Sequence, residues 1–316
     1  MSMTTYSVYR PVRPLFLIAV IFVFASAGFA QTGAVAPTSE RLIKFNVIVT
    51  ERADHAVDDV RKEDLQVTEN GATRTLTHFA LDDRPLTVGF VIDASGSVRR
   101  ILNYLIDSAK LVAEGMKPGD EAFVARFVGP EQFQIKEPMT TDRGSIEDTL
   151  DDIYVEGGQT AVHDALDKAL TYLEENRSGD AKARRGLLVL VTDGEDRDSK
   201  IKDAKTILAR ARQSNVQIFV LGLTKFSGLQ SSGSRATSLL NGLAEQSGGR
   251  AFFPASASGL PEAAREVARE LHMQFTLGYA VDDKNPTAER SVQVKWVGQN
   301  DAGKRKVIVR PLVTGP

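Results

Sequence analysis

Short apolar runs and amphipathic stretches alternate along the chain from Leu86 onward. Apolar runs rich in β-branched residues predict strands, and apolar residues spaced three or four positions apart predict helices. The predicted strands are Leu86–Ile92, Ala122–Val128, Gln132–Glu137, Gly186–Thr192, Val216–Leu223, Arg250–Phe253 and Gln274–Tyr279. The predicted helices are Val98–Gly115, Ser145–Ile153, Ala161–Asn176, Ser199–Ser214, Ala236–Ser247 and Leu260–His272. This alternation predicts an α/β fold with a doubly wound, mostly parallel sheet, helices on both faces and one antiparallel hairpin at an edge.

A β-rich segment, residues 40–85, precedes this α/β region. The alternating stretch Lys44–Thr50 predicts a half-buried strand, and Leu65–Glu69 predicts a second one. Asn70-Gly71 is a strong hairpin signal, so Arg74–Leu81 is expected to be the return strand. A region of this size rarely folds alone, and we expect it to pack against the α/β region.

A second β-rich segment, residues 281–316, lies after the α/β region. Ser291–Val297 alternates like a strand, and Lys306–Arg310 is its predicted hairpin partner across residues 300–303. An isolated hairpin is marginally stable in water. The tail is therefore expected to pair with the β-rich segment at 40–81.

The N-terminus has the three-part pattern of a secretory signal peptide. Arg10 and Arg13 precede the apolar run 15–25, small residues follow, and residues 1–30 are expected to be removed. Residues 31–39 are small and polar and predict a linker. The alternative is an uncleaved anchor, which is disfavoured because a spanning helix needs about 20 apolar residues. The mature protein is expected to be soluble, to have no stable membrane insertion and to be exported to the periplasm or the extracellular space.

The composition excludes several classes of function. The 316-residue chain has no cysteine, so a disulfide framework, a thiolate nucleophile and a cysteine-containing zinc site are impossible. The formal net charge is −2, whereas nucleic-acid binding normally needs a concentrated basic face. We therefore expect no nucleic-acid partner and no cysteine chemistry.

Oxygen-bearing side chains come directly after the predicted strand Leu86–Ile92. Asp93, Ser95 and Ser97 lie at a spacing of two in one turn, so three oxygen atoms can converge from a single loop. Ligands of open α/β sheets bind at the carboxyl ends of the strands. Carboxylate and hydroxyl oxygens are hard ligands suited to Mg²⁺, Mn²⁺ or Ca²⁺. The alternative is a plain turn and helix N-cap, for which Ser and Asp are also favoured.

Two other loops offer matching groups. Thr160 follows a Gly-Gly loop and precedes a predicted helix, of which it is the natural cap. Asp193 follows the second fully apolar strand, residues 187–191. Because both groups stand at the same edge as the Asp93 turn, the combination favours metal binding over a plain turn.

The motif Asp93-Ala94-Ser95-Gly96-Ser97, together with Thr160 and Thr192-Asp193-Gly194, resembles the metal-ion-dependent adhesion site (MIDAS) of the von Willebrand factor type A (VWA) domain. The resemblance implies a Rossmann-like VWA domain, which we place at residues 86–280. It further implies that Asp93, Ser95 and Ser97 hold Mg²⁺ directly or through water. It assigns to Thr160 a ligand role that depends on conformation, and to Asp193 a role mainly through a bound water. The sequences that flank the domain resemble bacterial exported members of this group.

This donor set favours binding over catalysis. Three hydroxyls and two carboxylates leave Mg²⁺ undercompensated, and Mg²⁺ usually retains waters in a near-octahedral shell. An exposed Asp or Glu of a partner protein could displace one water and bridge the two proteins. The sequence therefore predicts an exported, non-enzymatic protein-binding module for adhesion or envelope complex assembly.

Two alternatives remain open. One is a metal-stabilised scaffold in an envelope complex. The other is a hydrolase in which Ser95 or a metal-bound water is the nucleophile and His163 or Asp193 is the base. The sequence disfavours the hydrolase, because it contains neither a Gly-x-Ser-x-Gly elbow nor a phosphate-binding loop, and no second Asp lies two residues after Asp93.

Acidic residues close to Asp193 raise the question of a second metal site. Glu195, Asp196 and Asp198 are more simply interpreted as solvating the loop and favouring the N-terminus of a helix that begins near Ser199. The acidic cluster is therefore not assigned an ion.

Three other features receive structural interpretations. His163 is expected to be a packed or capping residue, and Trp296 is expected to pack on a face of the terminal hairpin. Residues 226–235 are rich in Ser and Gly and predict a long loop, which in a functional role would shape the rim for a partner.

Overall fold

The computed structural model describes residues 41–51, 55–179, 183–194, 196–223, 230–281, 290–299 and 305–310. All of them belong to one compact unit, Ser39–Pro316. The predicted signal peptide at 1–30 and the linker at 31–39 lie outside the described residues. Within the described ranges, no helix combines the length and the apolar character that crossing a membrane requires.

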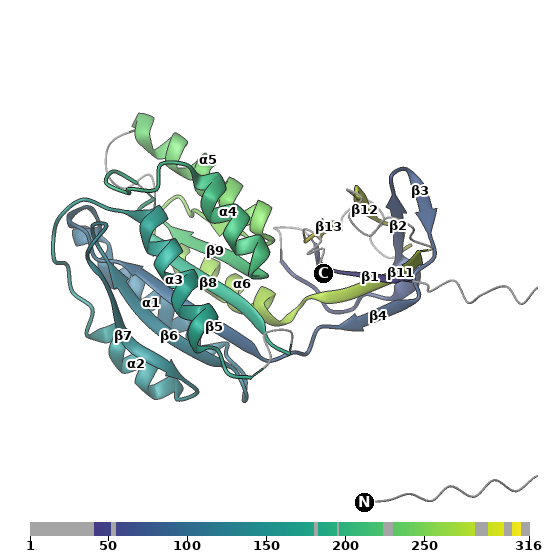
Figure 1. Ribbon diagram of the computed structural model, residues 1–316, viewed down its shortest axis with the longest axis horizontal. Coiled ribbons are helices and arrows are strands. Elements are labelled where there is room, and N and C mark those ends of the chain that lie inside the picture. The colour runs from purple at the N-terminus through teal and green to yellow at the C-terminus, as the bar shows by residue number, and fades with distance from the viewer. Residues whose placement is uncertain are drawn as a thin grey trace, which may run out of the picture. The chain divides into compact units, whose positions relative to one another are not determined.

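A six-stranded sheet with the order β10-β9-β8-β5-β6-β7 lies at the centre of the fold (Figure 1). Its strands are β5 (Leu86–Asp93), β6 (Glu121–Phe127), β7 (Phe133–Thr140), β8 (Arg185–Thr192), β9 (Val216–Gly222) and β10 (Ala251–Phe252). The strands β5, β6, β8, β9 and β10 run parallel, and β7 pairs antiparallel with β6 at one edge. This topology confirms the doubly wound sheet and its antiparallel edge hairpin.

Helices cover both faces of this sheet (Figure 1). The α-helices are α1 (Leu102–Glu114), α2 (Arg143–Asp151), α3 (Val162–Asn176), α4 (Ala204–Gln213), α5 (Gln230–Ser247) and α6 (Leu260–His272), and the 3-10 helices are η2 (Lys62–Asp64), η3 (Gly96–Arg100) and η4 (Ala257–Gly259). Buried side chains of α1, α2 and α6 pack on one face, and those of α3, α4 and α5 pack on the other. Phe90 and Ile92 of β5 belong to the first core and Val91 to the second. Because β5 is buried on both sides, its sequence is a continuous apolar run.

Five of the six α-helices begin at other residues than predicted, and the difference is largest for α1, α4 and α5. A short 3-10 helix, η3, precedes α1, and Ile101, with φ −124° and ψ −3°, separates the two. α5 begins at Gln230, so the loop predicted at 226–235 is wrong from that residue on, and residues 226–229 lie outside the described ranges. Ser and Gly have low helix propensity, which is why the sequence pattern did not predict the first turns of α5.

The flanking segments form two further sheets. One has the order β13-β1-β11-β4 and the other has the order β12-β2-β3. Their strands are β1 (Arg41–Thr50), β2 (Leu65–Glu69), β3 (Ala72–Arg74), β4 (His78–Leu81), β11 (Phe275–Val281), β12 (Val292–Trp296) and β13 (Lys306–Val309). Apolar side chains of both sheets share one core, and Trp296 packs against it. The expected pairing of the tail with the N-terminal β-rich segment is therefore confirmed.

Three pairings among these strands differ from the prediction. The turn at Asn70-Gly71 joins β2 to β3 as expected, but the predicted return strand is divided: β3 pairs with β2, and β4 pairs with β11. The predicted terminal hairpin is wrong, because β12 pairs with β2 and β13 pairs with β1. β11, which we expected in the α/β sheet, pairs with β1 and β4. The alternation of apolar and polar residues identifies a strand but not the strand with which it pairs, because the hydrogen bonds between strands come from the backbone.

Candidate metal centre

Three loops meet at the carboxyl ends of β5 and β8. The two strands are neighbours in the sheet, so Asp93, the last residue of β5, and Asp193, which comes after β8, emerge at the same edge. The loop that carries Thr160 is fixed to this edge by backbone hydrogen bonds, among them Glu156 N to the Ala94 carbonyl oxygen at 3.0 Å. The fold therefore brings together residues that lie up to 100 positions apart in the sequence.

The hydroxyl groups of the site contact one another. Thr160 Oγ1 donates to Ser95 Oγ at 2.8 Å, and Ser95 Oγ lies 2.9 Å from Ser97 Oγ. The backbone N–H of Ser95 donates to Asp93 Oδ1 at 2.9 Å, which fixes the carboxylate beside the hydroxyls. Ser95 is the N-cap residue of η3, but its side chain makes no capping hydrogen bond. A plain helix N-cap therefore does not explain the position of the Ser95 hydroxyl.

The two carboxylates of the site are buried and influence each other. Asp93 is fully buried and Asp193 is 4% exposed. Burial, followed by the negative charge of Asp193, raises the pKa of Asp93 to about 7, although hydrogen bonds from Thr192 and Ser95 oppose the shift. A divalent cation between these oxygen ligands would offset the repulsion. The donor set thus fits a hard cation held by carboxylates and hydroxyls.

Ser97 connects the site to solvent. Asp93, Ser95, Thr160 and Asp193 are buried, whereas Ser97 is exposed. A ligand from another molecule therefore has to approach along the Ser97 side of the cluster.

The N-terminus of α3 is not capped by Thr160, contrary to the sequence-based expectation. The N-cap residue is Ala161, and the capping groups come from the loop after β8. Asp196 accepts from Val162 N at 2.9 Å, and the Ser199 hydroxyl accepts from His163 N at 3.0 Å. Because these groups cap α3, the Thr160 hydroxyl is directed to Ser95.

The same loop corrects the predicted start of α4 and explains the position of His163. Backbone N–H groups of Lys200 and Ile201 donate to the Asp164 carboxylate at 2.8 and 2.9 Å, which keeps this segment out of a helix. α4 therefore begins at Ala204, not near Ser199. His163 is buried, and its Nδ1 lies 2.9 Å from the Ile201 carbonyl oxygen, so the prediction of a packed residue is confirmed. Glu195 lies outside the described residues.

The sequence analysis did not predict the role of two other residues at this edge. Thr192 is fully buried and donates from Oγ1 to Asp93 Oδ2 at 2.6 Å. Arg126 forms an ion pair of 2.6 Å with Glu156, which belongs to the Thr160 loop. A charged residue within the apolar stretch 122–128 was the available signal for Arg126. Across the described ranges, no group of three or more His, Asp or Glu residues could hold a metal, so this site depends on its hydroxyls.

Replacing Gly158 with Ala should weaken metal binding by roughly tenfold. Gly158 has φ +89°, and a Cβ there would lie 2.8 Å from Val128 Cγ1, so the Thr160 loop would have to shift. Overpacking of this kind costs about 1–3 kcal/mol, and 1.4 kcal/mol corresponds to tenfold in affinity. Calorimetric titration with Mg²⁺ measures the change. Gly157→Ala is the matched control, because Gly157 has φ +91° but no atom within 4 Å of the added Cβ. Equal losses of affinity in both variants would contradict the proposed role of the Val128 contact.

The fold and the site together define a class of protein. A doubly wound α/β domain with hydroxyls and carboxylates at the carboxyl edge of its central strands has the features of a VWA-type domain. The model of the von Willebrand factor type A domain matches residues 87–266, more than half of the chain. The chain therefore belongs to this family, whose domains are generally non-enzymatic adhesion modules. No curated protein matches the chain.

Solved structures share the fold at low sequence identity. Proximal thread matrix protein 1 from the mussel byssus is 20% identical, with a TM-score of 0.50, over 65% of this chain and 51% of that chain. A structure of the same mussel protein with a zinc-occupied MIDAS motif has a TM-score of 0.49, with 20% identity over 65% of this chain and 50% of that chain. An aerotolerance-related membrane protein from Bacteroides fragilis is 18% identical, with a TM-score of 0.44, over 58% of this chain and 99% of that chain. At these identities the likeness concerns the fold alone.

Proposed function

We propose that this protein is an exported, non-enzymatic binding module that presents a divalent cation, Mg²⁺ in the first place, to an acidic side chain of a partner protein. Asp93, Ser95, Ser97, Thr160 and Asp193 are the proposed ligands. The observation that carries the proposal is their convergence at one edge of the sheet through the contacts Thr160–Ser95 and Ser95–Ser97. Mn²⁺ and Ca²⁺ also suit such oxygen ligands.

The donor set of the site supports a ligand from a partner protein. Two carboxylates and three neutral hydroxyls offer five oxygen ligands, so a six-coordinate Mg²⁺ would keep water in at least one position of its coordination shell. The exposed residue Ser97 marks the side from which a carboxylate of another protein could replace such a water. Arg99 and Arg100, both exposed on η3, add positive charge beside this route.

The surroundings of Ser95 disfavour the hydrolase alternative. A serine nucleophile needs a base within hydrogen-bond reach, and the Ser95 hydroxyl contacts Ser97 and Thr160. The Nδ1 atom of His163 is directed to the Ile201 carbonyl oxygen and to Asp196, at 2.9 and 3.1 Å. The arrangement is therefore better suited to binding than to acyl transfer.

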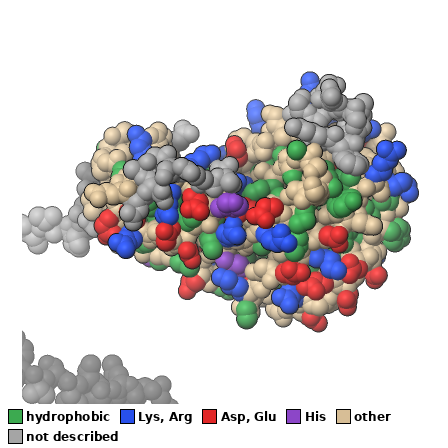
Figure 2. Space-filling model, turned by 180° about the vertical axis from the view of Figure 1, so that it is seen from behind, with side chains coloured by type: hydrophobic (Ala, Val, Ile, Leu, Met, Phe, Trp, Pro, Cys, Tyr) green, Lys and Arg blue, Asp and Glu red, His purple; other side chains and the backbone are tan. Residues whose placement is uncertain are grey.

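Export and the class of partner rest on the sequence and on the surface charge. The signal-peptide pattern of residues 1–30 supports export to the periplasm or beyond. Acidic and basic side chains are interspersed on the face shown in Figure 2, which fits the net charge of −2. Such a face lacks the concentrated positive charge that nucleic-acid binding uses.

Capture of partners from envelope extract should require both the cation and Asp93. We expect the immobilised wild-type protein to retain a partner in Mg²⁺ and to lose it in EDTA. The immobilised Asp93→Asn variant should not retain this partner in either buffer. Loss of retention by at least tenfold would correspond to about 1.4 kcal/mol of binding free energy. Mass spectrometry identifies the partner, and its Asp→Asn and Glu→Gln variants then locate the bridging carboxylate.

Asp198→Asn is the matched control for this experiment. Asp198 is an exposed carboxylate in the same loop as Asp193. Its substitution makes the same change of charge and keeps the backbone hydrogen bond from Asp198 N to the Thr160 carbonyl oxygen at 3.0 Å. Retention that survives EDTA and Asp93→Asn would refute the metal bridge. Turnover of ester, phosphate or peptide substrates that disappears in Ser95→Ala would instead establish the hydrolase.

A further inference from the structure

A cavity lies at the opposite end of the sheet from the candidate metal centre. It has a volume of about 460 Å³ and is lined by β1, β11 and the connection between β4 and β5 on one side, and by the first residues of β8 and β9 on the other. Arg185 is the first residue of β8, whereas the metal centre lies beyond its last residue, Thr192. At about 3.3 Å per residue, the two sites are about 23 Å apart. The cavity is of a size that takes small molecules.

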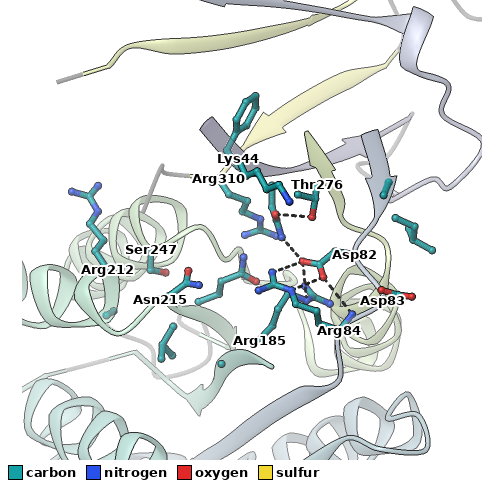
Figure 3. Close-up of a pocket in the computed structure, with 18 of the residues that line it drawn as sticks. Lys44, Asp82, Asp83, Arg84, Arg185, Arg212, Asn215, Ser247, Thr276 and Arg310 are labelled. Atoms are coloured by element: carbon teal, nitrogen blue, oxygen red, sulfur yellow. Dashed lines mark hydrogen bonds and ion pairs between the residues drawn. The ribbon is translucent and has the colours of Figure 1, made fainter. Parts of the chain in front are cut away.

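Positive side chains predominate in the lining of this cavity. Five Lys or Arg residues line it, against two Asp residues, Asp82 and Asp83. Polar amides and hydroxyls, including Asn46, Asn215 and Thr276, also line the cavity, together with apolar residues such as Phe45 and Val216. Arg185 and Arg310 reach the cavity from different elements and extend toward each other (Figure 3).

Arg185 is buried, and some of its side-chain N–H groups have no hydrogen-bond acceptor among the described residues. Its side chain donates from Nη2 to the Leu271 carbonyl oxygen, and Nε lies 3.4 Å from Asp82 Oδ2. Nη1 has no hydrogen-bond partner among the described residues, although Arg185 is only 3% exposed. Asp82 cannot fully satisfy Arg185, because its two oxygens already accept from Arg84 at 2.7 and 2.8 Å and from Asn46 at 2.6 Å.

The Arg310 side chain has fewer hydrogen-bond acceptors among the described residues than the Arg185 side chain. Its backbone N–H donates to the Asn46 carbonyl oxygen at 2.8 Å, which holds Arg310 beside β1. The guanidinium stacks on Phe219, 5.5 Å from the ring centroid, and its nearest carboxylate oxygen, Glu270 Oε2, is 4.0 Å from Nη2. None of its three side-chain nitrogens has a hydrogen-bond partner within the described part of the chain, and Arg310 is 3% exposed. Glu270 instead pairs with Arg250.

The buried charges around the cavity therefore do not balance. Asp82 is held by Arg84 and Glu270 by Arg250. Among the described residues, Arg185 and Arg310 therefore share these two carboxylates at the longer distances of 3.4 and 4.0 Å. Burial lowers the pKa of Arg185 to about 10 and that of Arg310 to about 9, so both side chains still carry a charge at neutral pH. Burying unpaired charges is costly, and guanidinium groups match the geometry of carboxylate and phosphate oxygens.

We propose that this cavity binds a small polar molecule through an oxyanion group, a carboxylate or a phosphate, held between Arg185 and Arg310. The ligand would supply the acceptors that the two guanidinium groups lack among the described residues. The amides and hydroxyls of the lining would contact its neutral polar groups. This site is separate from the metal centre and does not depend on the proposed adhesion function.

The proposal is tested by thermal unfolding of the purified chain in metal-free buffer at constant ionic strength. Inorganic phosphate and succinate serve as the two probes, and chloride is the reference anion. We expect at least one probe to raise the melting temperature by about 5 °C at a hundredfold excess over its dissociation constant. A response to phosphate alone identifies a phosphate site, and a response to succinate identifies a carboxylate site. The same response in Asp93→Asn shows that the metal centre is not involved. Equal melting temperatures in all three anions would overturn the proposal.

Two types of substitution locate the site. Arg310→Gln and Arg185→Gln should lose the response to the anion, whereas Arg143→Gln, an exposed arginine on α2, should keep it. Thr276→Asp provides a test that keeps both arginines, because its carboxylate would occupy the cavity and reduce the affinity for the probe. An undiminished response in Thr276→Asp, or in both arginine variants, would contradict binding between Arg185 and Arg310.

Discussion

Asp93→Asn is expected to abolish Mg²⁺ binding while leaving the metal-free protein at least as stable as the wild type. Asp93 is fully buried, and burial together with the neighbouring Asp193 raises its pKa to about 7. The carboxylate is thus unfavourable without a cation. An amide of the same shape removes the repulsion, and its oxygen can accept from the Ser95 N–H while its NH₂ group donates to the Thr192 hydroxyl oxygen. With the charged ligand removed, affinity for Mg²⁺ should fall at least 100-fold, which is about 2.7 kcal/mol.

Thermal unfolding and calorimetric titration, each with Mg²⁺ and with EDTA, measure both parts of this prediction. The wild type should melt at a higher temperature in Mg²⁺, and Asp93→Asn should melt at the same temperature in both buffers. Asp198→Asn should respond to Mg²⁺ like the wild type. A variant that is clearly less stable than the wild type in EDTA would assign the Asp93 carboxylate a structural role. Wild-type affinity for Mg²⁺ in Asp93→Asn would exclude Asp93 as a ligand.

The central sheet could be predicted because its strands are buried on both faces. All residues of β5 and β8 are buried, and both strands contain a continuous apolar run, residues 88–92 and 187–191, that ends where the polar loops begin. α6 begins at Leu260 and ends at His272 as predicted, because its apolar residues recur at helical spacing. Strand partners outside this sheet could not be predicted. β11 comes directly after α6, yet it pairs with β1, more than 200 residues earlier, and no local pattern encodes that choice.

The candidate ligands could be placed from the sequence because each follows a strand or precedes a helix at the same edge of the sheet. The hydrogen bonds around these ligands could not be predicted from the sequence. In the sequence, Thr192 has the pattern of an ordinary β-branched strand residue. Its hydroxyl bonds to Asp93 because β5 and β8 are neighbours in the sheet, which the sequence pattern does not predict. Asp196 reads as a solvated loop residue, and only the fold brings it to the N-terminus of α3. Arg310 is a charged residue at the end of the predicted strand Lys306–Arg310, and its burial results from the pairing of β13 with β1.

Gly249→Ala is expected to destabilise the protein by about 3 kcal/mol or more, which is the largest effect on stability that we predict. A Cβ at this position would lie 1.8 Å from the Ile218 carbonyl oxygen and 2.5 Å from the Ile218 carbonyl carbon. These are backbone atoms of β9, a strand held between β8 and β10, so they cannot move without breaking the ladder. The glycine itself is fixed by its N–H, which donates to the Ala244 carbonyl oxygen at 2.7 Å. Urea unfolding monitored by circular dichroism measures the loss.

Gly242→Ala is the matched control for this close approach. Gly242 lies in α5, where an added Cβ would meet only the end of the Gln246 side chain at 3.6 Å. Alanine is the better helix former by up to about 1 kcal/mol, so this substitution should leave the protein equally stable or more stable. The two variants make the same chemical change seven residues apart, and only Gly249→Ala should lower the urea midpoint. If Gly249→Ala unfolds at the wild-type midpoint, β9 and the turn after α5 must be able to separate, and the tight packing that fixes this edge of the sheet would be refuted.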